Sequence, residues 1–288
     1  MNSSIGTRSF AQRWAGLQES RGGLVLGVPP STKWLTHWGL EDSIGGARTF
    51  CELLLPVIGQ IAAVKAQMPF FERFGAAGME MAAWFFAECR QRETLAVADA
   101  KRCDAEDTMG AYANLYFDEV TGLGADAVTV LPYMGTGSLE PLCRTAAVGG
   151  RAVMVLVRTS NHQASTQSAT TADGRTVSEV TADHISFLNE DLAPDATTGP
   201  VAALIGAPPV EALRLARRLP RSIISLPGLG RPGRTVEDYA DLATELGHRA
   251  MFPVTTGVLR AGPQALNEAV DMWQKQLRAL RQANMREF

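Results

Sequence analysis

The sequence predicts an α/β protein with the fold of a (β/α)8 TIM barrel, and three observations lead to that fold class. Eight short segments are almost continuously apolar, as parallel strands are when both of their faces are buried. A segment with helical periodicity follows each of the eight. Polar residues stand at the ends of the predicted strands, where barrels build their active sites. Eight such units favour a closed barrel over an open doubly wound sheet.

Turn residues and apolar spacing define the elements of the first half. Apolar side chains at helical spacing predict a helix over residues 9–20, which a glycine pair ends. Two prolines stop the first strand, residues 24–28, and a loop with two tryptophans follows it. The remaining elements of this half are apolar or periodic segments. The strands cover residues 61–65, a stretch from 95 and residues 126–131; the helices cover residues 42–59, 69–90, a segment reaching 120 and one from 138.

The second half repeats the pattern with one interruption. Residues 160–176 are rich in Thr and Ser and form the longest predicted irregular segment. Pro-Gly-Leu-Gly, at residues 227–230, ends the seventh strand. The predicted strands cover residues 152–158, 201–205, 222–226 and 250–254; the helices cover a segment reaching 189 and residues 209–218, 236–246 and 263–285. We therefore expect residues 1–288 to form a single barrel domain with a short N-terminal helical extension.

Composition narrows the class of protein. Hydrophobic residues make up 46% of the chain and charged residues 20%, which is ordinary for a globular domain with a full core. The net charge is −3 without a basic run, so we expect no nucleic-acid partner. No apolar stretch approaches the roughly 20 residues of a membrane span, and the polar N-terminus is unlike a secretory signal. The four cysteines and four histidines are widely separated, which favours a reducing cytoplasm and no metal site.

One charged motif stands at the end of the third predicted strand. Asp99, Lys101 and Asp104 follow five small or apolar residues in the spacing Asp-x-Lys-x-x-Asp. Successive strand residues alternate between faces, so the side chains of Asp99 and Lys101 point the same way. Lys65 ends the second predicted strand. A salt bridge at a strand end is the plainer interpretation, but the barrel gathers these ionisable groups at its mouth, which favours catalysis.

These residues resemble a known family. The segment Val64-Lys65-Ala-Gln-Met-Pro-Phe-Phe-Glu72 and the motif Asp99-Ala-Lys101-Arg-Cys-Asp104 are similar to the lysine and the Asp-x-Lys-x-x-Asp of orotidine 5′-phosphate decarboxylase, in its longer bacterial branch. The resemblance continues in order along nearly the whole chain. Its further segments are Asp126–Gly135, Arg158-Thr-Ser-Asn161, Pro227-Gly-Leu-Gly230 and Val258–Pro263.

The resemblance implies a carboxy-lyase that needs neither a metal nor an organic cofactor. Lys101 would stabilise the carbanion left at C6 of a pyrimidine nucleotide and deliver a proton to it. Asp99 would lie beside the substrate carboxylate, and Lys65 and Asp104 would complete an alternating array of charges. In the family the second aspartate comes from the partner subunit, so Asp104 implies a homodimer with shared active sites. Thr108 matches the threonine that follows this aspartate.

The pyrimidine end of the ligand also has its counterparts. Ser160 stands where the family's strand-five serine contacts the base, and we favour this interpretation over that of a strand-end cap. Gln167 matches the family's loop glutamine, although a glutamine in a polar loop needs no function. Both residues are therefore candidate substrate-binding residues.

The ribose and phosphate end departs from the family pattern. Pro29 replaces the aspartate that holds a ribose hydroxyl, and Pro232 replaces a loop glutamine. Thr256 replaces the arginine that clamps the phosphate, and Leu131 replaces an asparagine. The backbone around Gly228 and Gly230 would still offer an anion site. Arg234 or Arg231 would substitute for the lost arginine, unless both are ordinary solvated side chains.

Three functional hypotheses follow. The first is a decarboxylase that acts on an orotidine-like or related heterocyclic carboxylate with a changed or absent 5′-phosphate, as in specialised metabolism. The second is a genuine orotidine 5′-phosphate decarboxylase of pyrimidine synthesis with a rebuilt phosphate site. The third is a relative that binds nucleosides or nucleotides without catalysis, or that uses Lys101 for proton transfer at an enolate. Retention of the charged array favours an enzyme, because burying such groups is costly.

Overall fold

The computed structural model describes residues 8–161, 165–230 and 233–282. Eight parallel strands form a closed barrel in which each strand pairs with its neighbours in chain order and β8 pairs with β1. This confirms the predicted TIM barrel. The strands are β1 (Leu24–Val28), β2 (Ala63–Gln67), β3 (Leu95–Arg102), β4 (Ala127–Val130), β5 (Ala152–Arg158), β6 (Val201–Ile205), β7 (Ile224–Ser225) and β8 (Ala250–Val254).

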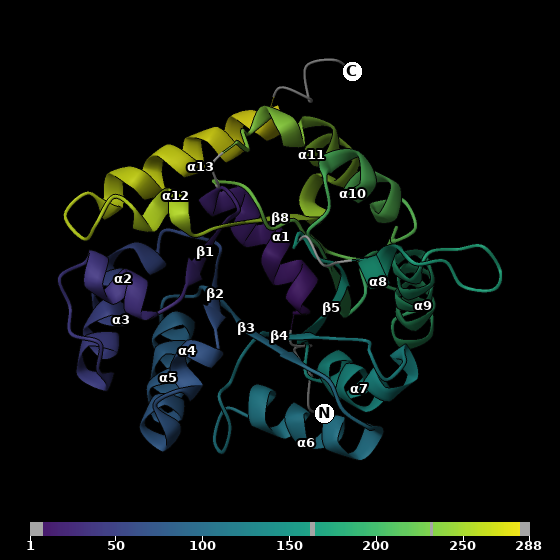
Figure 1. The fold of residues 1–288 in the computed structure, drawn as a ribbon, viewed down its shortest axis with the longest axis horizontal. Coiled ribbons are helices and arrows are strands. Elements are labelled where there is room, and N and C mark those ends of the chain that lie inside the picture. Colours follow the sequence, from purple (N-terminus) through teal and green to yellow (C-terminus); the bar gives the residue numbers. More distant parts are fainter. Residues whose placement is uncertain (1–7, 162–164, 231–232, 283–288) are drawn as a thin grey trace, which may run out of the picture.

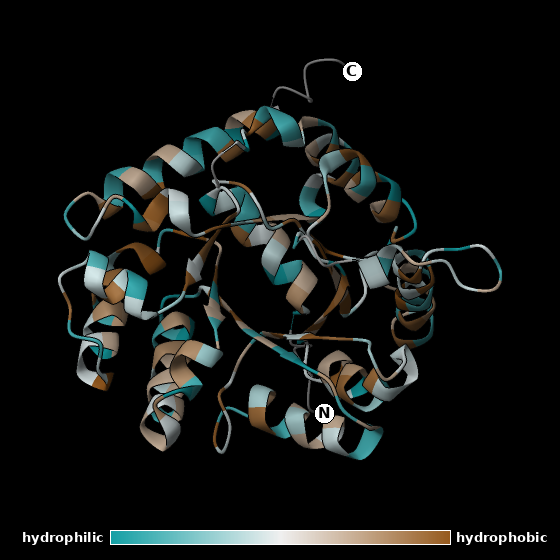
Figure 2. Ribbon diagram, viewed as in Figure 1, coloured by the Kyte–Doolittle hydropathy of each residue, from teal (hydrophilic) through white to brown (hydrophobic). Residues whose placement is uncertain are grey.

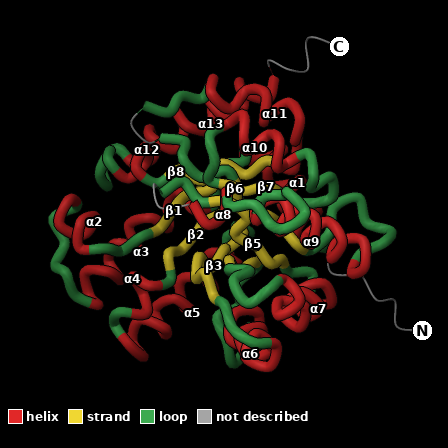
Figure 3. The backbone as a smooth tube through the Cα atoms, turned by 45° about the vertical axis from the view of Figure 1, so that its right-hand side comes forward, coloured by secondary structure: helices red, strands yellow, loops and turns green. Residues whose placement is uncertain are grey.

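Helices surround the barrel, with the strands at the centre of the molecule (Figure 3). Their faces are divided between apolar and polar residues, so single helices such as α13 carry both colours in Figure 2. The α-helices are α1 (Phe10–Arg21), α2 (Thr32–His37), α3 (Ile44–Ile58), α4 (Pro69–Glu72), α5 (Gly75–Gln91), α6 (Glu106–Phe117), α7 (Glu140–Val148), α8 (Ser165–Ser168), α9 (Val177–Leu192), α10 (Pro209–Ala216), α11 (Ala240–Leu246), α12 (Thr256–Leu259) and α13 (Leu266–Gln282). Short 3-10 turns are η1 (Thr136–Leu139), η2 (Glu237–Tyr239) and η3 (Gly247–Arg249).

The barrel has two apolar layers because strand residues alternate between its inside and its outside. On β1, for example, Leu24 and Leu26 belong to the large core between barrel and helices, whereas Val25 belongs to a smaller core inside the barrel. On β4, Val128 lies in the outer core and Ala127 in the inner one. Lys65, Asp99 and Thr129 are buried polar residues at inward positions nearer the carboxyl ends of the strands.

Helix α1 closes the amino end of the barrel (Figure 1). Phe10 and Trp14 are buried in the inner core, and Trp14 Nε1 donates to the carbonyl of His248 at 2.8 Å. Gln18 Nε2 donates to the carbonyl of Ala250 at 2.9 Å. Access to the inside of the barrel is consequently left to the carboxyl ends of the strands.

Several element boundaries differ from the sequence prediction. The loop with the two tryptophans contains α2, and the segment after β8 contains α12. Strand β2 runs two residues beyond Lys65, so this lysine lies within the strand. The predicted helix over residues 69–90 is two helices, because Gly75 begins α5 with a φ of +61°, outside the helical region. The irregular segment after β5 contains α8.

Two further properties concern membranes and cysteines. Among the helices of the described residues, none has both the length and the apolar character needed to cross a membrane. Cys51, Cys89, Cys103 and Cys143 are free thiols.

Candidate active site

Three charged side chains meet at the carboxyl ends of β2 and β3. Lys65 Nζ donates to Asp99 Oδ2, and Lys101 Nζ donates to Asp99 Oδ1 at 2.5 Å. The side chain of Asp99 is 3% exposed and that of Lys65 is 10% exposed, whereas that of Lys101 is 45% exposed. The structure thus holds one buried carboxylate between two ammonium groups, of which Lys101 faces the mouth of the barrel.

The electrostatic surroundings keep Asp99 ionised. Burial by itself would raise the pKa of this carboxyl group, but the neighbouring ammonium groups of Lys65 and Lys101 outweigh it. The pKa of Asp99 is therefore well below its ordinary value. Asp99 can act only as a hydrogen-bond acceptor and as a fixed negative charge at neutral pH.

An irregularity in the sheet accompanies this array. Ala98 pairs with Val128, but the next pair is Arg102 with Val130, so three residues of β3 face a single residue of β4. Lys101 lies in this bulge with a φ of +48°, a left-handed conformation that is uncommon for residues other than glycine. Bulges change the direction of the side chains that they carry, so this bulge contributes to the position of the Lys101 ammonium group beside Asp99.

The single β4 residue opposite the bulge is Thr129, which the sequence analysis did not single out. Its side chain is fully buried, and its hydroxyl donates to Asp99 Oδ1 at 2.9 Å. The same hydroxyl accepts from the backbone N–H of Lys101 at 3.0 Å. A threonine within an otherwise apolar strand was the available signal in the sequence. Its hydrogen-bond partners can be identified only from the register of β4 against β3.

A cavity of about 230 Å³ opens beside Lys65. Gly228 and Thr256, two of the predicted substrate-binding residues, lie in its wall. Gln67, a residue that the sequence analysis also missed, lines it too, and within the described residues its buried Oε1 accepts no hydrogen bond. The remaining lining residues are Pro227, Leu229, Pro253 and Thr255.

A second cavity, of about 330 Å³, lies at the carboxyl ends of β5 and β6. Ser160 and Arg234 line it together with Arg158, whose guanidinium Nε donates to Glu211 at 2.9 Å. Gln167 accepts from the backbone N–H of Thr159 at 2.9 Å, at the edge of the same region. The structure therefore groups Arg234 with Ser160, not with Gly228 and Thr256.

The other predicted residues lie apart from these groups. Asp104 is partly exposed and accepts from the backbone N–H of Ala105 at 2.8 Å, and Thr108 is exposed on α6. Gly230 packs against β8 and α13, where a Cβ would lie 2.9 Å from Val254 Cγ1. Close packing thus explains why a glycine occupies position 230. Arg231 and Pro232 lie outside the described residues.

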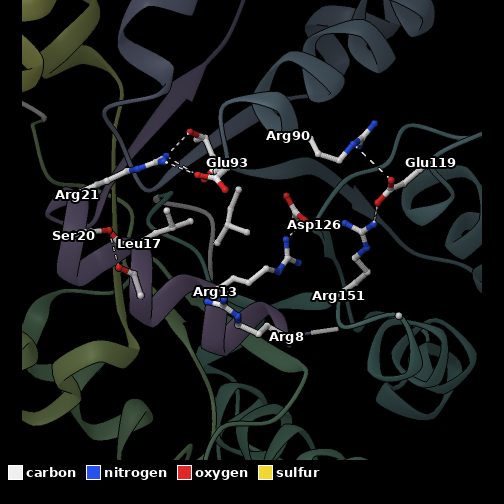
Figure 4. Close-up of a pocket in the computed structure, with 14 residues that line it drawn as sticks. Arg8, Arg13, Leu17, Ser20, Arg21, Arg90, Glu93, Glu119, Asp126 and Arg151 are labelled. Carbon is white, nitrogen blue, oxygen red and sulfur yellow. Dashed lines mark hydrogen bonds and ion pairs between the residues drawn. The ribbon is translucent and has the colours of Figure 1, made fainter. Parts of the chain in front are cut away.

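A cavity of about 570 Å³ at the opposite end of the barrel is rich in arginines (Figure 4). Arg13 and Arg151 both donate to Asp126, at 2.6 and 2.8 Å, and Arg21 donates to the carbonyls of residues 61, 92 and 93. These contacts tie α1 to the amino ends of the strands, which is a stabilising role at this face of a barrel. Among the described residues, no group of three His, Cys, Asp or Glu side chains is placed to hold a metal ion.

Comparisons with known proteins agree with this fold. Residues 30–231 match the model of the "Orotidine 5'-phosphate decarboxylase / HUMPS family". An orotidine 5′-phosphate decarboxylase of Salinispora tropica is 38% identical over 271 residues, which cover 91% of this chain and 95% of that protein. One of Corynebacterium glutamicum (strain R) is 34% identical over 257 residues, covering 88% and 92%. A crystal structure of a candidate orotidine 5′-phosphate decarboxylase from Streptomyces avermitilis has a TM-score of 0.87 and 32% identity, covering 98% of this chain and 99% of that one.

The fold and the charged array thus define a TIM-barrel carboxy-lyase. The chain belongs to the orotidine 5′-phosphate decarboxylase / HUMPS family.

Proposed function

We propose that the protein decarboxylates orotidine 5′-phosphate to uridine 5′-phosphate. The observation that carries the proposal is the ionised Asp99 held between Lys65 and Lys101 at the open end of the barrel. The relatives named for this activity, at 34% and 38% identity, support the ordinary nucleotide as substrate. They favour it over the changed substrate that the sequence alone led us to expect.

In this proposal each member of the array has a part. Loss of CO₂ leaves an electron pair at C6 of the pyrimidine, and the ammonium group of Lys101 would stabilise that charge. Lys101 then gives C6 a proton and recovers one from solvent, since its side chain is half-exposed. Asp99 would orient Lys101 and stand beside the substrate carboxylate, and Lys65 would keep Asp99 ionised. As the family resemblance implies, we expect no metal or organic cofactor.

A second subunit would complete the array. Within one chain, the ammonium groups of Lys65 and Lys101 share the single carboxylate of Asp99. A second carboxylate would neutralise the remaining positive charge when no substrate carboxylate is bound. Asp104 lies near the mouth without reaching Lys101 in its own chain. Tyr133 and Met134, which follow β4, are 88% and 55% exposed, as expected of a surface that a second copy covers. We therefore propose a homodimer in which Asp104 and Thr108 enter the partner's site.

The nucleotide would extend across both cavities. Ser160 and Gln167, on the β5 side, would contact the pyrimidine. Gln67 Oε1, which accepts no hydrogen bond within the described residues, would accept one from a ribose hydroxyl, the bond that Pro29 cannot make. The backbone at Gly228 and the hydroxyl of Thr256 would hold the phosphate.

One observation favours a second candidate function. Lys65 is the only cation among the side chains that line the cavity beside Gly228 and Thr256 within the described residues, and Arg234 lines the other cavity. Arginine is the strongest phosphate ligand among side chains. A decarboxylase whose substrate carries no 5′-phosphate would suit such a cavity.

Turnover of two substrates separates these candidates. Purified protein is mixed with orotidine 5′-phosphate or with orotidine, with and without a chelator, and loss of the orotate absorbance is followed. The proposal predicts a much larger kcat/KM for the phosphorylated substrate and no effect of the chelator. Equal or preferred turnover of orotidine would select the second candidate. Tight binding of a uridine-like ligand without turnover of either substrate would select a non-catalytic relative.

A further inference from the structure

Thr129 occupies a distinctive position in the sheet. It is the one residue of β4 that faces the three-residue bulge of β3, and it is fully buried on the inner side of the barrel. Its neighbours along β4, Val128 and Val130, belong to the outer core. A valine at position 129 would satisfy the apolar character of this strand equally well, so the hydroxyl needs a separate explanation.

The hydrogen bonds of Thr129 have a defined direction. The backbone N–H of Lys101 can only donate, so the threonine oxygen accepts from it at 3.0 Å. The hydroxyl proton is then directed at Asp99 Oδ1, which is 2.9 Å away and, being ionised, can only accept. Lys101 Nζ donates to the same carboxylate oxygen at 2.5 Å. The backbone and the side chain of Lys101 are thus joined through Thr129 and Asp99 in a closed ring.

This ring replaces contacts that the bulge removes. At a bulge the ladder between strands is interrupted and a backbone group is left without its regular partner. The Thr129 hydroxyl supplies that partner to Lys101, whose φ of +48° is itself unfavourable for a residue with a Cβ. The regular ladder resumes where Leu131 N–H donates to the carbonyl of Arg102 at 2.8 Å.

We propose that Thr129 is a positioning residue for decarboxylation: its hydroxyl holds Lys101 in the left-handed conformation and fixes the carboxylate of Asp99 against the Lys101 ammonium group. This inference rests on the proposed function. Thr129 acts through Asp99 and Lys101 and touches no reacting atom. Its loss should therefore change kcat more than the binding of substrate.

The test compares Thr129→Val, which keeps the shape and removes the hydroxyl, with Thr129→Ser, which keeps the hydroxyl. Thr94→Val is the matched control, because Thr94 is also a buried threonine and directly precedes β3 at its amino end. Its hydroxyl donates to the backbone carbonyl of Ile58, away from Asp99 and Lys101. With orotidine 5′-phosphate as substrate, T129V should lower kcat about tenfold to a hundredfold, the range expected for a hydrogen bond to a charged group. KM should change by less than about threefold, and T129S should retain most of the wild-type kcat.

Three outcomes would overturn the proposal: a kcat for T129V within about twofold of the wild type, equal losses in T129V and T129S, or an equal loss of kcat in T94V. If T129V does not fold, Thr129→Ala takes its place with the same criteria. Crystal structures of the wild type and T129V give a readout that needs no turnover. Lys101 should leave the left-handed region, or its ammonium group should leave Asp99, in the variant only. An inactive wild type would defeat the proposed function, whereas an unmoved Lys101 in T129V would defeat this inference alone.

Discussion

The surroundings of Asp99 keep its carboxyl group ionised. Its carboxylate accepts hydrogen bonds from Lys65, Lys101 and Thr129. The two lysines lower its pKa despite burial, which acts in the opposite direction. A group of this kind stabilises the folded protein only while it is ionised. The charge array is therefore part of the stability of the barrel as well as of its chemistry.

Acid should remove this stabilisation. The folded-state pKa of Asp99 is lower than the unfolded value, which is about 4, so its contribution is full above that pH. The contribution is lost as the pH falls below about 4 and toward the folded-state pKa. We expect the free energy of unfolding of the wild type to fall more steeply below about pH 4 than that of Asp99→Asn. Urea denaturation at pH 7, 5, 4 and 3 measures this difference, and parallel curves for the two proteins would contradict it.

The sequence could predict part of the site at this scale. Strand alternation predicts Asp99 and Lys101 on one face, and their side chains are in contact. The arrangement itself depends on the bulge and the left-handed conformation of Lys101, which alternation does not predict. Thr129 could not be predicted, because its role depends on a bulge that shifts the register of β3 against β4. Register depends on how two strands pair, so it cannot be predicted from the sequence of either strand alone.

At the scale of elements, the strands that are continuously apolar and bounded by turn residues could be predicted best. β1, β5, β6 and β8 have the predicted bounds. The short helices α2, α4, α8 and α12 could not be predicted as separate elements, because helices of four to six residues have little stability of their own and depend on tertiary contacts. The second strand was placed two residues early because the apolar residues at its start do not reveal where the ladder begins.

A substitution in helix α1 measures how much the closure of the amino end of the barrel contributes to the free energy of unfolding. Trp14 is fully buried, and its indole N–H has a carbonyl partner. Trp14→Ala should lower the free energy of unfolding by about 3–5 kcal/mol, because it leaves a cavity in the inner core. Glu19→Ala, at an exposed position of the same helix, is the control and should change it by less than about 0.5 kcal/mol. Urea denaturation measures both, and equal effects would show that α1 is not part of the core.

At the scale of the whole molecule, the barrel brings together residues from all parts of the chain. Lys65 and Thr256 line one cavity although about two thirds of the chain separates them. The fold class could be predicted from the eight apolar strands, and the family from the charged motif together with the matching segments along the rest of the chain. The single-domain organisation, the cytoplasmic location and the dimer stay predictions.

Mixing two inactive variants tests whether the active sites are shared. Lys101→Ala and Asp104→Ala should each be inactive alone. If Asp104 reaches the partner's site, one site of each mixed dimer contains both intact residues. An equimolar mixture, after subunit exchange, should then regain about a quarter of the wild-type activity, since half of the dimers are mixed. No recovery despite exchange, measured with differently tagged chains, would place Asp104 in the site of its own chain.

If Lys101 is the proton donor, its replacement by alanine should abolish the turnover of orotidine 5′-phosphate. Wild type, Lys101→Ala and the exposed control Lys33→Ala are compared, with circular dichroism as the check on folding. We expect an active wild type, an unaffected control and a folded Lys101→Ala protein without measurable decarboxylation. Activity of Lys101→Ala within about tenfold of the wild type, or roughly 1.4 kcal/mol of barrier, would contradict it.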